Sequence, residues 1–192
     1  MSGRYLGVDA GNTKTVALVA TADGQVQGWG RAGSGDLYGA GEGPAEQNVT
    51  LAVRSALEMA GAEPGEVAAA AFRLAGVDWP EDVEHWQAVL AQAFPALGPV
   101  SVLNDGYAPL RWGRLDGHGV AVLAGTGPAV AARGPAGEFV GGWWIQQPLG
   151  GQAIGTAAFH AVVRAWLGLA PGTVLTGLLV EQQGVADVDE LL

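Results

Sequence analysis

The sequence contains no cysteine and only one lysine, Lys14, among its 192 residues. Without cysteine, the chain can form neither disulfides nor thiolate metal sites. Lysine and arginine together number 9 against 19 acidic residues, which gives a formal net charge of −10. Because phosphate contacts from a basic face supply most of the affinity for nucleic acids, we expect no nucleic-acid partner.

The chain also lacks long hydrophobic runs. No apolar stretch approaches the roughly 18 residues that a membrane-spanning helix needs, and polar Asp9 interrupts the first apolar run too early for a signal peptide. We therefore expect a cytoplasmic protein with no membrane partner. Apolar residues make up 49% of the chain. Glycine is also abundant, at 32 residues, and many of the glycines lie in short clusters between apolar runs. This pattern is typical of a folded α/β protein whose loops carry its function.

The first half of the chain predicts the element order βββ-α-β-α-β. Asp23-Gly24 is a typical hairpin turn, an apolar period of 3.6 marks the first long helix, and glycine-rich Gly30–Gly43 is predicted to be a loop. The expected strands are Tyr5–Val8, Thr15–Ala20, Gln25–Trp29, Val67–Leu74 and Val100–Leu103, and the expected helices are Pro44–Ala60, Pro80–Phe94 and Tyr107–Arg111.

A second cycle of the same kind follows. The expected strands are Val120–Ala124, Ala129–Arg133 and Phe139–Trp144, and the expected helices are Ile154–Leu167, Thr173–Val180 and Val185–Leu192. Two βββ-α cycles predict two α/β lobes, residues 1–115 and 116–192, each opening with three antiparallel strands in a mixed sheet. We expect the second lobe to be incomplete, and its apolar C-terminal helices to favour a homodimer.

Two glycine-containing turns each follow the first strand of a cycle. In the first, Asp9 could hold Mg²⁺ through water, Gly11 lets the backbone approach a phosphate, and the residues through Thr15 add hydroxyl and lysine donors. In the second, Gly125-Thr126-Gly127 can offer backbone N–H groups to an anion. Each turn could equally be an ordinary hairpin turn, but their repetition favours phosphate binding.

Asn104-Asp105 follows the strand Val100–Leu103. A carboxylate at the carboxyl end of a strand could accept a proton from a substrate hydroxyl. The same residues could instead cap the helix Tyr107–Arg111. Local sequence leaves both interpretations open.

Taken in order, these segments resemble the actin/hexokinase-like ATPase superfamily, and within it the N-acetylglucosamine kinase and BadF/BadG/BcrA/BcrD-type ATPase families. The matching segments are Leu6–Thr15, Leu74–Asp78, Asn104-Asp105, Gly125–Gly127 and Gly141-Gly142-Trp143. The resemblance implies actin-like, ribonuclease H-like lobes. It also implies a kinase that uses ATP and Mg²⁺ to phosphorylate a hydroxyl of a small-molecule sugar, N-acetylglucosamine or glucosamine.

The resemblance also implies roles for individual residues. Asp9 would be the metal ligand and Asp105 the general base, with Gly35-Asp36 as a lid. The implied phosphate-binding residues are Gly11, Asn12, Thr13, Lys14, Thr15, Gly125, Thr126 and Gly127. The implied substrate-binding residues are Asp36, Ala75, Gly76, Asn104, Asp105 and Gly142.

The sequence departs from the family pattern in two ways. Family members carry a Gly-Asp-Glu-Gly-Ser segment after Gly-Gly-Trp, whereas this chain has no acidic residue between Phe139 and Val180. It also lacks the later glycines that would bind adenosine, so we expect weak ATP affinity. Two other functions stay open: a type III pantothenate kinase, which shares the Asp-x-Gly-Asn-Thr opening, and a non-catalytic remnant that binds sugar or nucleotide.

Overall fold

The computed structural model describes residues 3–141 and 150–192. Among these, the first compact unit comprises residues 3–123 and 129–141, and the second comprises residues 124–128 and 150–192. The division of the chain into lobes at residue 115 stays a prediction.

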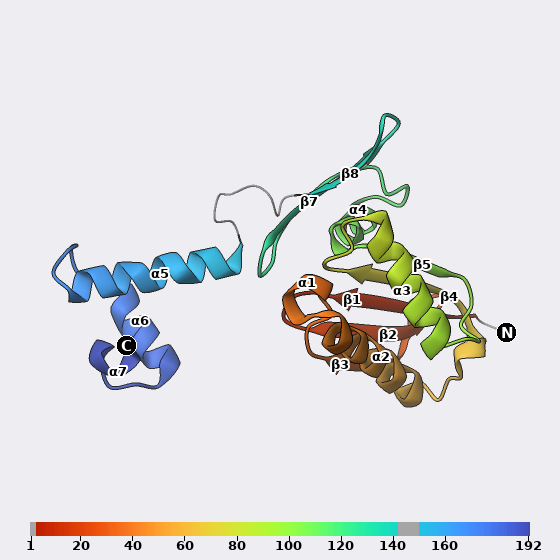
Figure 1. Ribbon diagram of the computed structural model, residues 1–192, viewed down its shortest axis with the longest axis horizontal. Coiled ribbons are helices and arrows are strands. Elements are labelled where there is room, and N and C mark those ends of the chain that lie inside the picture. The colour runs from red at the N-terminus through yellow and green to blue at the C-terminus, as the bar shows by residue number, and fades with distance from the viewer. Residues whose placement is uncertain (1–2, 142–149) are drawn as a thin grey trace. The chain divides into compact units, whose positions relative to one another are not determined.

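A five-stranded mixed sheet forms the centre of the first unit (Figure 1). Its strands are β1 (Arg4–Ala10), β2 (Thr15–Thr21), β3 (Val26–Ala32), β4 (Val67–Leu74) and β5 (Val100–Asn104), in the order β3-β2-β1-β4-β5. The first three strands pair antiparallel, while β4 is parallel to both β1 and β5. The predicted order βββ-α-β-α-β and the mixed sheet are confirmed.

Helices α2 (Glu42–Met59) and α3 (Pro80–Ala93) supply the main apolar core together with this sheet. Side chains alternate along each strand, so in β1 Leu6, Val8 and Ala10 are buried while the residues between them are exposed. The opposite face of the sheet is open to solvent and presents three large apolar side chains, Tyr5, Leu18 and Trp29. The core therefore lies on one side of the sheet only, within this unit.

The prediction of a continuous loop over Gly30–Gly43 was wrong. Strand β3 continues to Ala32, and a short helix, α1 (Leu37–Ala40), follows. A side chain at Gly30 would collide with the backbone carbonyl of Ala52 in α2, so this glycine lets the helix lie directly on the strand. The glycine that suggested a loop is thus required by close packing.

The first unit also holds a small three-stranded sheet in the order β6-β7-β8. The strands β6 (Gly119–Ala124), β7 (Pro128–Gly134) and β8 (Gly137–Gly141) follow the helices η2 (Asp105–Tyr107) and α4 (Ala108–Gly113). A second, smaller core joins Leu110 of α4 to Ala121 and Ala131 of the sheet. The last three positions of the predicted strand Phe139–Trp144 lie outside the described residues. A further short 3₁₀ helix, η1, spans Pro64–Glu66.

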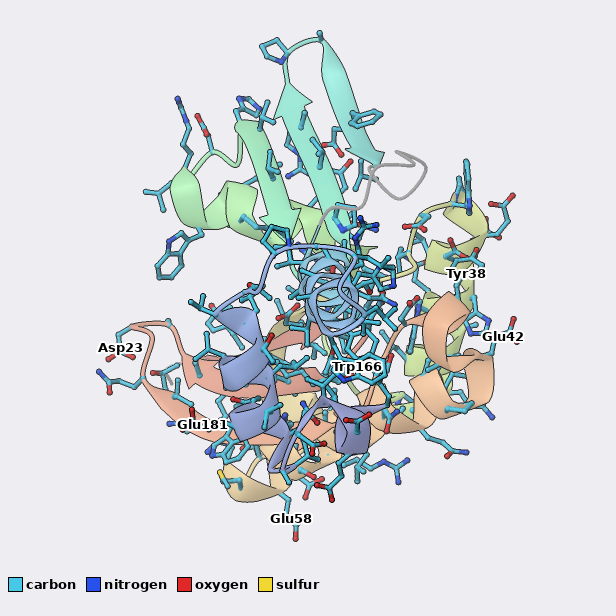
Figure 2. The ribbon with its side chains drawn as sticks, turned by 90° about the vertical axis from the view of Figure 1, so that its left-hand side faces the viewer. Asp23, Tyr38, Glu42, Glu58, Trp166 and Glu181 are labelled. Atoms are coloured by element: carbon cyan, nitrogen blue, oxygen red, sulfur yellow. The ribbon has the colours of Figure 1, made fainter. Side chains whose placement is uncertain are left out.

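The second unit consists of the turn between β6 and β7 and three helices, α5 (Gly151–Trp166), α6 (Leu175–Gln183) and α7 (Val188–Leu191). Helix α5 contacts both α6 and α7, and Trp166 near its C-terminal end is partly exposed (Figure 2). Among the described helices, none is long and apolar enough to cross a membrane.

Candidate functional site

The carboxyl ends of three neighbouring strands bring several predicted site residues to one edge of the large sheet. In register, Ala10 of β1 lies opposite Leu74 of β4, and Leu74 lies opposite Asn104 of β5. Because these strands are parallel, the segments that follow them emerge at the same edge. The first turn, Ala75-Gly76 and Asn104-Asp105 are therefore neighbours although they are far apart in the sequence.

The first predicted phosphate turn joins β1 to β2. Its ends are held by a hydrogen bond from the Gly11 amide to the Lys14 carbonyl, 2.9 Å, and residues 12–14 are exposed. The carbonyl of Gly11 accepts from the amide of Gly35 at 3.2 Å and from the hydroxyl of Ser34 at 3.3 Å. The turn is thus fixed at its base, while Asn12, Thr13 and Lys14 lie where a ligand could reach them.

Thr15 departs from its predicted role. It is the first residue of β2 and is fully buried on the core face of the strand, together with Ala17. Its hydroxyl has no hydrogen-bond partner among the described residues. A side chain at Gly35 would contact this hydroxyl at 2.8 Å, so the Gly35 backbone packs directly against the Thr15 side chain. The position of Thr15 corrects its assignment as a phosphate-binding hydroxyl.

Asp36 caps helix α1 and does not belong to a loose loop. Its carboxylate accepts from the Tyr38 amide at 3.1 Å, and the residue is only 7% exposed. Gly76 has a φ of +73°, and a side chain there would collide with the same carboxylate. The Gly35 amide also donates to the Gly11 carbonyl, so this segment is hydrogen-bonded on both sides, and its role as a lid stays a prediction. Asp36 and Gly76 are nevertheless direct neighbours, as two predicted substrate-binding residues should be.

Asn104, and not Asp105, takes the capping role. The Asn104 side chain accepts from the Gly106 amide at 2.8 Å and caps η2, while its amide nitrogen donates to Asp78 at 2.8 Å. Both ends of this buried amide thus bond within the protein, and its contact with substrate stays a prediction. The hydrogen bond that caps η2 is therefore made by Asn104.

The Asp105 carboxyl is electrostatically unusual. Burial raises its pKa to about 6, and the negative charges of Asp9 and Asp36 contribute to the increase. Burial also raises the pKa of Asp9, although the positive charge of Lys14 partly offsets the increase. A carboxyl group with a pKa near neutrality can both accept and release a proton under ordinary conditions.

A hydrogen-bonded network beside Asp105 was missed in the sequence. Asp82, at the start of α3, accepts from the backbone amides of Asp78 and Trp79 at 2.9 and 2.8 Å. Its other oxygen accepts from the hydroxyl of Tyr38 at 2.9 Å, which raises the pKa of Tyr38 to about 12. The spacing of Asp82 after Pro80 is a typical helix-capping signal and could have identified this part of the network.

The second predicted phosphate turn belongs to the second unit. The carbonyls of Gly125 and Thr126 accept from the amides of Gly151 and Gln152, at 2.7 and 3.2 Å, at the start of α5. Gly150, with a φ of +94°, packs against the turn, and a side chain there would contact the Thr126 carbonyl at 3.0 Å. Two of the first N–H groups of α5 are thus satisfied by the turn, and its phosphate binding stays a prediction.

The predicted substrate-binding residue Gly142 lies outside the described residues, as does most of the Gly141-Gly142-Trp143 segment. Within the described part of the chain, no group of three or more His, Cys, Asp or Glu side chains is arranged to hold a metal ion. Mg²⁺ commonly uses only one or two carboxylates together with phosphate oxygens and water, so the prediction that Asp9 holds Mg²⁺ does not require such a group.

Comparison with known proteins supports the fold class that the sequence predicts. The family model for the BadF/BadG/BcrA/BcrD ATPase family matches residues 6–172. No curated protein matches the sequence. Among solved structures, one assigned as an N-acetylglucosamine kinase from Chromobacterium violaceum has a TM-score of 0.71 at 23% identity, over 99% of this chain and 67% of that one.

Two further structures extend the comparison. One assigned as an N-acetylglucosamine kinase from Porphyromonas gingivalis has a TM-score of 0.69 at 21% identity, over 96% of this chain and 64% of that one. A glucokinase of the ROK family from Streptomyces griseus, solved with glucose and AMPPNP, has a TM-score of 0.53 at 22% identity, over 95% of this chain and 72% of that one. The chain therefore spans about two thirds of the length of the first two relatives.

Proposed function

Because the chain belongs to the BadF/BadG/BcrA/BcrD ATPase family, we propose that it transfers the γ-phosphoryl group of ATP to a hydroxyl group of a sugar. The observation that carries the proposal is the Asp105 carboxyl group, whose pKa burial raises to about 6 at the carboxyl edge of the sheet. The fold shared with structures assigned as N-acetylglucosamine kinases favours an amino sugar, N-acetylglucosamine or glucosamine, as the acceptor.

In this reaction, Asp105 accepts the proton of the acceptor hydroxyl as its oxygen attacks the γ-phosphorus. The bond between the γ-phosphorus and the bridging oxygen breaks, and ADP leaves with that oxygen. Little covalent chemistry is required of the protein, so positioning and charge stabilisation supply most of the rate. A pKa of about 6 suits a base that must be deprotonated near neutral pH.

Asp36 and Gly76 are proposed to border the acceptor, because they contact each other beside the strand ends that carry Asp105. Backbone amides of Gly11–Lys14 and the Thr13 hydroxyl would bind phosphate oxygens, while Asp9 would hold Mg²⁺ through water. When bound, Mg²⁺ neutralises charge that develops on the phosphates.

The direct test measures ADP release from MgATP with a panel of acceptors: N-acetylglucosamine, glucosamine, glucose and pantothenate. We expect release that depends on an amino sugar, with the phosphorylated sugar detected by mass spectrometry. An Asp105→Asn variant should bind nucleotide as the wild type does but release little ADP. Release with pantothenate alone would assign the other kinase function, and sugar binding without turnover would assign a non-catalytic role.

A further inference from the structure

Asn104 connects the segment after β4 to the turn that carries Asp105. Its side-chain nitrogen donates to Asp78 Oδ1 at 2.8 Å, and its side-chain oxygen accepts from the Gly106 amide at 2.8 Å. The residue is 3% exposed, so water competes little for either bond. Asp78, Asn104 and the peptide after Asp105 thus form one continuous chain of hydrogen bonds.

The hydrogen bonds of Asn104 affect Asp105 through the Gly106 amide. It belongs to the peptide group that directly follows the Asp105 Cα atom, so its orientation sets the direction in which the Asp105 side chain leaves the backbone. Gly106 is also closely surrounded: an added side chain would contact the Asn104 oxygen at 2.9 Å, Val140 at 3.2 Å and Ala131 at 3.3 Å. The turn therefore has little room to adopt another arrangement.

The backbone of Asp78 is itself fixed by a hydrogen bond to Asp82. The carboxylate of Asp82 accepts from the backbone amide of Asp78 at 2.9 Å and from that of Trp79 at 2.8 Å. The N-terminus of α3 thereby fixes the backbone of Asp78, whose carboxylate fixes Asn104 in turn. The start of α3 is linked in this way to the end of β5 and the adjoining η2, and the bond between Asn104 and Asp78 spans 26 positions of the sequence.

Keeping an aspartate at position 78 costs stability. Burial raises its pKa to about 6, the negative charge of Asp82 adds to the increase, and the hydrogen bond from Asn104 only partly offsets it. A carboxyl group with such a pKa is less favourable in the folded chain at neutral pH than in the unfolded chain. Costs of this kind are more common at functional sites than at purely structural ones.

We infer that Asp78 is a positioning residue for phosphoryl transfer, which through the Asn104 side chain holds the η2 turn and so orients the Asp105 carboxyl toward the acceptor hydroxyl. The inference rests on the proposed role of Asp105 as the base. Asp78 need not touch the substrate, and its removal should affect turnover much more than binding.

The test compares three variants with the wild type. Asp78→Ala removes the acceptor for Asn104 and should lower kcat about 10–100-fold, since a misplacement of about 1 Å costs on that order, while KM for sugar and for ATP changes less than about twofold. Asp78→Asn keeps an oxygen that can accept from Asn104 and should restore kcat to within about threefold of the wild type. Glu81→Gln, an exposed acid in the first turn of α3, is the control for loss of a nearby charge and should leave kcat unchanged.

A second measurement does not depend on activity. Hydrogen exchange of the Gly106 amide, followed by NMR, should be about tenfold faster in Asp78→Ala than in the wild type, and close to the wild-type rate in Asp78→Asn and Glu81→Gln. Unchanged exchange in Asp78→Ala, or a kcat in Asp78→Asn as low as in Asp78→Ala, would overturn the inference. If the wild type phosphorylates no acceptor, the proposed function is wrong, and the exchange rates still decide whether Asp78 holds the turn.

Discussion

The substitution Asp105→Asn should lower turnover and raise the stability of the folded chain at the same time. The pKa of Asp105 is about 6 in the folded chain, against an ordinary value of 3.8 that we take for the unfolded chain. The folded chain therefore binds the proton more tightly. The stabilisation by this proton is complete below pH 3.8 and is lost as the pH rises through about 6.

The difference of about two pKa units corresponds to about 3 kcal/mol at most, at 1.36 kcal/mol per unit. Since the residue keeps some contact with solvent, about 1–2 kcal/mol is a better expectation. Asparagine has nearly the same shape and carries no charge. Thermal unfolding at pH 8 should therefore show a midpoint about 2–6 °C above that of the wild type. At pH 3.5, where both side chains are mostly neutral, the midpoints should converge.

The same variant should lose about 10²–10⁴-fold in kcat, because the base can no longer accept the proton. Asp116→Asn is a matched control with the opposite electrostatics. Asp116 is exposed and bonded to Arg114, which lowers its pKa to about 2, so its replacement should slightly reduce stability at pH 8 and leave turnover intact. If Asp105→Asn instead destabilised the chain at pH 8 and kept normal turnover, Asp105 would be a structural residue and the reasoning would be refuted.

Three further predictions concern the same unit. The kcat/KM of the wild type should fall about tenfold per pH unit below about pH 6 and level off above it, as expected for a base with the pKa of Asp105; a flat profile between pH 5 and 8 would contradict this. Gly76→Ala should lower the free energy of unfolding by about 1–3 kcal/mol in denaturant titrations, because Gly76 has a φ of +73° and little space beside Asp36; no loss would show that the segment relaxes easily. Thr15→Val should leave the stability unchanged or raise it by up to about 1 kcal/mol, with unaltered nucleotide binding by calorimetry, because the hydroxyl is buried without a partner; weakened binding would restore Thr15 as a ligand.

The sequence predicts the strands of the large sheet well, because their signals are local. Mainly apolar runs of four to eight residues, followed by a polar residue or by a glycine-containing turn, identified β1, β4 and β5. Parallel pairing then brings the ends of these strands together, so Asp9 and Asp105 could be expected near one another. This much of the candidate site follows from the order of elements alone.

The polar network around Asp105 could not be predicted in the same way. Its bonds join residues far apart in the sequence: Asn104 to Asp78 across 26 positions, and Tyr38 to Asp82 across 44. Local sequence leaves Asn104 and Asp105 as equal candidates for the cap, since both residue types favour that position. In the structure, the Gly106 amide donates to the Asn104 side chain, which identifies Asn104 as the cap, and Asp78 accepts from the same side chain.

Thr15 illustrates a different error, since its position could have been predicted. If Thr15 is taken as the last residue of a phosphate-binding turn, its hydroxyl is expected to donate to phosphate. Counted as the first residue of β2, it falls on the same face as Ala17 and Val19, because side chains alternate strictly along a strand. Those two residues are fully buried, so Thr15 has to be buried as well. The hydrogen bond between Gly11 and Lys14 closes the turn before Thr15, so the exposed hydroxyl of this segment is that of Thr13.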